Sequence, residues 1–459
     1  MRCNPICSNG PPLRENRPDR HTSILKPPSD HPRSPPPRFP FVLEYPTVMI
    51  KRIAGLYKEA YAGLPRGAWI LASADFINRC GFMVLVFLNL YLTQKLRFSL
   101  LQAGQVLGAY GLGSLLGSYL GGHLTDRIGA RAVMLSSLIS SGAILIVTGY
   151  VTGFIPLAGL LLLYGIVSSA LFPANDTAMA RLCAGEMRVK GFALRRLAAN
   201  LGITFGPVVG GFLILLDYRW LFWIDGLTTL ASAVVVALWV QVRPFSSAVQ
   251  ENAPDGAPVH VRSPWKDGPY LAFMGLLLVL LTVFSQLFST FNLYLNTRYG
   301  LPENRIGPLW SVNTIMIVVI EMVLLHSLRK RNEMKIIALG ACFIGTGFGL
   351  LPLGRGFLFA AFTVAVWTMG EILTMPLTAT VASHRAGAAA GRYMGLLSLT
   401  FSLSMLIAPL AGNWLYGEVG GDVLWPIVGG TAILTAFGFW ALSRTLSPPK
   451  NGAAETPAA

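Results

Sequence analysis

Apolar runs of about 20 residues recur along most of this chain, and they constrain its fold more than any other feature. A run of that length is what an α-helix needs to cross the hydrocarbon core of a bilayer. The runs are continuously apolar rather than alternating, which favours helices over the strands of a membrane barrel. Twelve spans are predicted, at about 68–93, 101–121, 132–151, 156–176, 192–216, 220–242, 269–296, 305–327, 336–353, 356–382, 393–415 and 424–443.

The charged residues are few and unevenly placed. Of 459 residues, 53% are hydrophobic and 12% are charged, about half the charged share of a typical soluble protein. A net charge of +15 would suit a nucleic-acid-binding protein, but the basic residues gather in every second loop, as the positive-inside rule requires. We therefore predict a multi-pass protein of the cytoplasmic (inner) membrane, surrounded by lipid bilayer, with both termini in the cytoplasm and no nucleic-acid partner. The basic loops contain Arg127 and Arg131; Arg188, Lys190, Arg195 and Arg196; Arg243, Arg262 and Lys266; Arg329, Lys330, Arg331 and Lys335; and Arg385 and Arg392.

Polar segments divide the chain into domains. The first 48 residues are rich in proline and arginine and contain no apolar stretch that could serve as a signal peptide. An alternative start at Met49 would still leave a complete set of spans. The predicted organisation is a disordered tail at 1–48, an amphipathic interfacial helix at 49–66, a six-helix bundle at 67–242, a cytoplasmic linker at 243–268, a second six-helix bundle at 269–444 and a disordered tail at 445–459.

The two halves of the chain repeat one another. At a shift of 203 residues, Asn89–Leu92 falls on the identical Asn292–Leu295 without a gap. At or near the same shift, Gly104 falls on Gly307 and Gly206–Gly210 falls on Ala408–Gly412. Several such coincidences in order predict two related bundles. The predicted fold class is all-α integral membrane protein, with twelve transmembrane helices in two six-helix pseudo-repeats.

A charged loop is predicted at Gly122–Arg131, between the second and third spans. It resembles the signature loop of the major facilitator superfamily, which reads G-x-L-x-D-R-x-G-R-R. The resemblance implies a twelve-helix secondary transporter, in which this loop contacts the neighbouring half-bundle and stabilises one of two alternating conformations. The alternative is a plain turn with positive-inside arginines. The matching residues are Gly122, Leu124, Asp126, Arg127, Gly129 and Arg131, whereas Ala130 departs from the pattern.

The fifth span carries a second motif. Its residues from Gly202 to Gly211 resemble the antiporter signature of that superfamily, G-x-x-x-G-P-x-x-G-G, and the resemblance implies an exporter of the drug:proton antiporter branch. Small residues allow close helix approach, and a proline bends a helix. Generic close packing is the alternative. The matching residues are Gly202, Gly206, Pro207, Gly210 and Gly211.

Ionisable residues inside the spans are candidates for proton coupling or substrate contact. They are costly in a bilayer and usually face a cavity or a partner. Asp75 and Arg79 lie one helical turn apart, with Asn78 beside them, and can pair as a structural ion pair. Glu321 and Glu371 have no partner within their own spans. The superfamily's arginine in the fourth span is missing, which leaves the coupling mechanism open. Asp176 and Asp225 are predicted to be helix-end structure.

Motifs for other chemistry are missing. The sequence contains no phosphate-binding loop of the G-x-x-x-x-G-K-[ST] type, no H-E-x-x-H and no G-x-S-x-G, so we predict no enzyme and no cofactor. The cysteines and histidines do not cluster, so we predict neither disulfide nor metal site. The resulting prediction is a monomeric, proton-coupled antiporter that exports small amphipathic molecules. An importer of a nutrient or peptide, and a non-transporting sensor or assembly factor, are the alternatives.

Overall fold

The computed structural model describes residues 61–183, 187–240, 264–328, 331–386 and 390–444. Within these ranges the chain forms helices and no strand, which confirms the predicted all-α class. The predictions for the tails at 1–48 and 445–459, for residues 49–60 and for residues 243–263 of the linker fall outside the described residues.

The helices follow one another in twelve membrane-length segments within the described ranges. The first bundle contains α2 (Arg66–Cys80), α3 (Val84–Leu90) and the π-helical η1 (Tyr91–Lys95), then α4 (Leu100–Ile128), α5 (Ala130–Thr148), α6 (Phe154–Leu182), α7 (Met187–Ile214) and α8 (Arg219–Trp239). The second contains the 3-10 turn η3 (Pro264–Lys266), α9 (Gly268–Phe284), η4 (Ser285–Phe288), α10 (Thr290–Tyr299), α11 (Glu303–Leu328), α12 (Glu333–Gly349), η5 (Leu351–Leu353), α13 (Phe357–Ala386), α14 (Ala390–Val419) and α15 (Gly421–Leu442).

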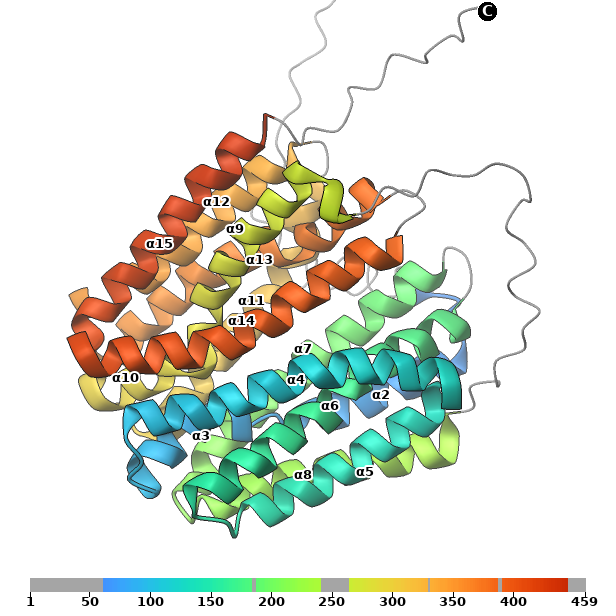
Figure 1. The fold of residues 1–459 in the computed structure, drawn as a ribbon, viewed down its shortest axis with the longest axis horizontal. Helices are drawn as coiled ribbons and strands as arrows, with labels where there is room; N and C mark the ends of the chain where they lie inside the picture. Colours follow the sequence, from blue (N-terminus) through green and yellow to red (C-terminus); the bar gives the residue numbers. More distant parts are fainter. Residues whose placement is uncertain (1–60, 184–186, 241–263, 329–330, 387–389, 445–459) are drawn as a thin grey trace, which may run out of the picture. The chain divides into compact units, whose positions relative to one another are not determined.

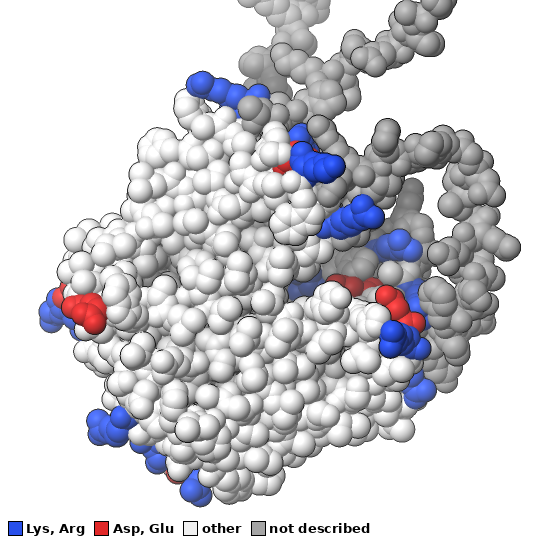
Figure 2. Space-filling model, viewed as in Figure 1, with Lys and Arg blue, Asp and Glu red and all other residues white. Residues whose placement is uncertain are grey.

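Eleven of these segments are long and apolar enough to cross a membrane. The twelfth, α4, has the length but not the hydropathy, because glycine, serine and glutamine dilute its apolar side chains. On the face shown in Figure 2, charged side chains lie near the ends of the helices and leave an uncharged surface between them. That distribution matches a protein whose middle zone faces lipid.

The structure corrects two predicted boundaries. The second span was predicted to end at residue 121, yet α4 continues through Gly122 to Ile128. Only Gly129, with φ of 90°, separates it from α5, so the predicted loop is mostly helix. Residues 62–65 form a turn around Gly63, with φ of 81°. Arg66, which was predicted to end the interfacial helix, therefore begins α2 instead.

The two bundles pack through reciprocal contacts, with α4 against α14 and α7 against α11 (Figure 1). Glycines make both contacts close. A Cβ added to Gly104 would lie 2.8 Å from the carbonyl oxygen of Pro409, and one added to Gly307 would lie 2.3 Å from that of Pro207. The repeat seen in the sequence is therefore a repeat of interhelical contacts, since both pairs occupy equivalent positions of the two halves.

An ion pair before the first helix of the second bundle joins three helices. Asp267 caps α9, accepts two hydrogen bonds from Arg385 of α13 at 2.8 and 2.9 Å, and accepts a third from Tyr393 of α14 at 3.0 Å. Burial alone would raise the pKa of the Asp267 carboxyl, but hydrogen bonds from Arg385 and Tyr393 outweigh it and hold the pKa below its ordinary value. The carboxylate therefore stays charged at neutral pH and holds these helix ends together.

Candidate functional site

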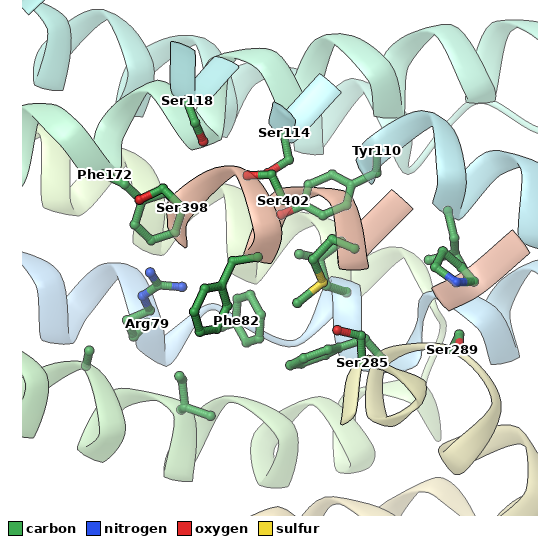
Figure 3. A pocket seen from close by; sticks show the side chains of 18 of the residues that line it. Arg79, Phe82, Tyr110, Ser114, Ser118, Phe172, Ser285, Ser289, Ser398 and Ser402 are labelled. Carbon is green, nitrogen blue, oxygen red and sulfur yellow. The ribbon is translucent and has the colours of Figure 1, made fainter. Parts of the chain in front are cut away.

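A cavity of about 610 Å³ lies between the two bundles (Figure 3). That volume suits a drug-sized molecule. Both halves contribute to its wall, and aromatic rings and serine hydroxyls predominate. The lining residues are Arg79, Phe82, Leu85, Leu107, Tyr110, Ser114, Ser118, Phe172, Pro173, Asp176, Ala199, Ile203, Ser285, Phe288, Ser289, Ser398, Phe401, Ser402, Met405 and Pro409.

One end of the cavity is closed by two asparagines, and we call it the asparagine end. Asn89 of α3 donates to the carbonyl oxygen of Ser289 at 2.5 Å and to Oδ1 of Asn413 at 2.9 Å. Asn292 of α10 donates to the carbonyl oxygen of Val86 at 2.6 Å. Val86 and Ser289 are themselves 203 residues apart, as are the two asparagines. The two halves are thus bound by a pseudo-symmetric pair of amide hydrogen bonds.

The opposite end carries the Gly122–Arg131 motif, and we call it the loop end. The cavity extends toward it as far as Ser118 and Asp176. Asp126 and Arg127 are exposed on the last turns of α4. Arg131 donates to the carbonyl oxygen of Ala237 at 2.7 Å, a contact within the first bundle. In this conformation, the described contacts of the motif do not reach the second bundle.

Asp75 does not pair with Arg79 as the helical spacing suggested. It lies 3.2 Å from Arg195 of α7 and accepts a hydrogen bond at 2.7 Å from Asn175 of α6. Arg195 also pairs with Asp176, so one guanidinium holds two carboxylates. Spacing along one helix made Arg79 a possible partner, but packing of α7 against α2 brings Arg195 closer.

Arg79 instead faces the cavity. Its guanidinium lies 5.1 Å from the ring centre of Phe172 and 5.5 Å from that of Phe82, which are cation–π distances. Its neighbour Asn78 turns away and accepts a hydrogen bond from Thr229 of α8 at 3.1 Å. Asp225, predicted to be helix-end structure, accepts from the backbone amide of Val84 at 3.2 Å, at the start of α3.

The two glutamates lie in the second bundle with different partners. Glu371, halfway along α13, accepts a hydrogen bond from Asn313 of α11 at 2.7 Å. Within the described ranges, no basic side chain lies at ion-pair distance from it. Glu321 of α11 pairs with Arg196 of α7 at 2.9 Å, across the contact between the bundles. Proton binding at Glu371 would therefore leave no buried cation unpaired.

The glycine motif of α7 faces two ways. A Cβ at Gly202, Gly206 or Gly210 would meet the segment from Phe76 to Met83, whereas one at Gly211 would lie 2.4 Å from the carbonyl oxygen of Glu303 on α11. The motif therefore packs α7 on both its own bundle and the other bundle. Pro207 supplies the carbonyl oxygen that faces Gly307.

The sequence reading missed Arg195 and Arg196 as site residues because it assigned them to a basic loop. Both nevertheless lay inside the predicted span at 192–216, and consecutive basic residues inside a span were a signal that could have identified them. Asn313 and Asn175 carried no comparable signal. No group of three or more histidine, cysteine, aspartate or glutamate side chains suited to a metal ion occurs among the residues that the structure describes.

Comparison with known proteins agrees with this geometry. A family model described as Major Facilitator Superfamily matches residues 71–400. An uncharacterized MFS-type transporter, YqjV of Bacillus subtilis strain 168, is 24% identical, covering 75% of this chain and 85% of that one. A Na(+), Li(+), K(+)/H(+) antiporter of Planococcus maritimus is 22% identical, over 74% of this chain and 87% of its own. Multidrug resistance protein 2 of Bacillus subtilis strain 168 is 24% identical, over 68% and 79%.

Solved structures show the same fold. A POT family transporter in complex with 5-aminolevulinic acid aligns with a TM-score of 0.72 at 16% identity, covering 84% of this chain and 98% of that one. The nucleoside transporter NupG aligns with a TM-score of 0.71 at 14% identity, covering 82% of this chain and all of the other. At these identities the likeness establishes the arrangement of helices and leaves substrate and direction to the site.

Proposed function

The chain belongs to the Major Facilitator Superfamily, and from that premise we propose that it is a proton-coupled antiporter that exports small amphipathic molecules by alternating access. It is a multi-pass membrane transporter rather than an enzyme. Relatives described as a cation/H(+) antiporter and as a multidrug resistance protein support antiport and efflux. The antiporter-like motif in α7 supports the same direction.

The proposal extends to the surroundings of the protein. The chain lies in the cytoplasmic membrane as a monomer, with the loop end and both termini in the cytoplasm. The charge bias of the loops supports this orientation. The structure is then open toward the cytoplasm and closed toward the outside by Asn89 and Asn292.

Glu371 carries the coupling proposal. It lies at membrane depth, it accepts a hydrogen bond from Asn313, and it has no cationic partner at ion-pair distance among the described residues. An ionised carboxylate without a cation is costly at that depth, and binding a proton removes the cost. Each protonation state of Glu371 therefore favours a different exposure to water, which is what couples proton movement to a change of conformation.

The test uses inside-out vesicles that contain the full chain, with an imposed pH gradient read by a quenched acridine dye. Amphipathic cations, amphipathic anions, neutral antibiotics, sugars and peptides are added one at a time. A substrate should cause dequenching, and Glu371→Gln should lower its rate at least about tenfold, because the amide cannot release a proton.

A matched exchange serves as the control for this assay. Glu418→Gln changes the same side chain at an exposed position near the end of α14 and should leave the rate unchanged. Equal dequenching rates in Glu371→Gln and Glu418→Gln would remove Glu371 from the coupling step. Flux that runs only inward together with protons would contradict export.

The loop-end motif is proposed to act in the opposite conformation. Antiparallel packing places Gly104 against Pro409 and Gly111 against Met405. That register carries Asp126 opposite the first turn of α14, where Arg392 is exposed. When the bundles close at the loop end, Asp126 and Arg392 can form a charge-assisted hydrogen bond.

Asp126→Asn should therefore lower the transport rate about five-fold, the effect of about 1 kcal/mol on the conformational equilibrium. Equilibrium binding of substrate to the inward-open state should not change. Initial rates in the vesicles and binding to the purified protein separate the two effects. Exchanging the charges, with Asp126→Arg and Arg392→Asp together, should restore part of the rate. If each single exchange and the double exchange are equally slow, the two residues do not pair.

A further inference from the structure

We propose that the cavity is built to bind amphipathic organic anions, with Arg79 as the residue that holds the carboxylate or sulfonate group. This inference rests on the proposed transport function and specifies the charge of its substrate. It starts from the inventory of charges in the cavity wall. Only Arg79 and Asp176 are ionisable acids or bases among the lining residues, and they differ in what already neutralises them.

Asp176 is already paired. Arg195 forms an ion pair with it and with Asp75, which also accepts the hydrogen bond from Asn175. A cationic ligand that approached Asp176 would have to compete with a guanidinium that is fixed by two carboxylates. The acidic side of the wall therefore offers little attraction for a cation.

Arg79 has no such partner. No carboxylate lies within 4.0 Å of its guanidinium in the part of the chain that the structure describes, and its recorded contacts are with the rings of Phe82 and Phe172. Asp75 and Asp225 are close enough to act on it electrostatically. Each, however, accepts hydrogen bonds from other donors, Asp75 from Asn175 and Asp225 from the amide of Val84.

An arginine in this state is poised for an anion. Its cost at membrane depth is only partly offset by two aromatic rings, and a bidentate carboxylate or sulfonate would offset much more. Figure 3 shows the guanidinium pointing into the cavity, toward the side where Phe172 and Ser398 lie. Phe288 and Phe401 provide apolar walls for the body of the ligand. The site therefore fits a molecule with one acidic group on an aromatic or aliphatic body.

The test compares three probes that share one body and differ in charge: naphthaleneacetate, naphthaleneacetamide and naphthylmethylammonium. Their equilibrium binding to the purified full chain in lipid nanodiscs is measured without a pH gradient. The anion should bind at least about tenfold more tightly than the neutral amide, as expected for a charge-assisted hydrogen bond, and the cation should bind most weakly. This comparison in the wild-type protein does not depend on the folding of any variant.

Variants assign the preference to Arg79. Arg79→Gln should remove the preference for the anion, and Arg79→Lys should keep part of it, since the charge remains without the planar fork. Arg66→Gln, an exposed position on the same helix and outside the cavity, is the control and should bind like wild type. Equal or tighter binding of the amide or the cation, an anion preference that survives Arg79→Gln, or no binding of the anion at millimolar concentration would overturn the proposal.

The result is independent of the antiport test. An anion preference that depends on Arg79, together with no proton flux in the vesicles, would retain the binding site and reject antiport. Proton-coupled export of a cation that is unaffected by Arg79→Gln would retain antiport and reject the anion site.

Discussion

Gly307→Leu is expected to abolish transport and to destabilise the folded bundle more than any other single change considered for this chain. A Cβ at this position would lie 2.3 Å from the carbonyl oxygen of Pro207 and 2.9 Å from the Cα of Val208. These are backbone atoms of α7, so no change of rotamer can relieve the clash. The helices α7 and α11 must move apart, and overpacking of this kind costs about 1–3 kcal/mol or more.

Thermal unfolding of the purified protein and initial transport rates measure this effect. Gly275→Leu in α9 introduces the same side chain at a position where an added Cβ meets no atom within 4 Å, and it should unfold at or slightly above the wild-type temperature. Gly307→Ala should lie between the two, because it adds only the first of the clashing atoms. If Gly307→Leu unfolded at the same temperature as Gly275→Leu and transported at the same rate, the contact between α7 and α11 would not limit the fold.

The number and order of the helices could be predicted from the sequence because each span must satisfy its backbone hydrogen bonds within itself. This physical demand is local, and it leaves a run of apolar residues that can be recognised without knowing the partners. Even the weakest case, α4, was recognisable although glycine lowers its hydropathy. The internal shift of 203 residues then predicted which contacts recur, and Gly104 and Gly307 make equivalent contacts in the structure.

Boundaries and partners were less predictable. The charged residues from Gly122 to Ile128 were taken for a loop, because polarity marks where a chain leaves the membrane but does not end a helix. Gly129, with its positive φ, ends it. Similarly, a spacing of four residues allowed Asp75 to meet Arg79, but the choice of Arg195 depends on how α7 packs against α2. A partner on another helix depends on tertiary packing, to which one helix's periodicity is blind.

The second large effect is expected from removing both amide hydrogen bonds at the asparagine end. Asn89→Ala with Asn292→Ala deletes the donors that reach the carbonyl oxygens of Ser289 and Val86. Each bond contributes about 1 kcal/mol net, so the pair accounts for about 2 kcal/mol, which corresponds to about a 30-fold change in the equilibrium between the two conformations. The asparagine end should then open in a much larger share of molecules.

Spin labels at Leu101 of α4 and Glu418 of α14 report this opening, since both are exposed near the asparagine end on different bundles. Labels are attached to cysteines on a background in which the native cysteines are replaced by serine. The double variant should shift the distance distribution toward longer values, and each single variant should give a smaller shift. Asn296→Ala is the matched control, because Asn296 donates to Leu301 within its own bundle.

The pseudo-symmetry makes this prediction sharper. Asn89 and Asn292 occupy equivalent positions and bind equivalent carbonyl groups, so their single variants should shift the distances in the same direction. Asn89 has a second acceptor, Oδ1 of Asn413, and its removal should have the larger effect of the two. A double variant with the wild-type distribution would mean that apolar contacts alone close this end. The hydrogen bonds would then be a consequence of closure rather than a cause.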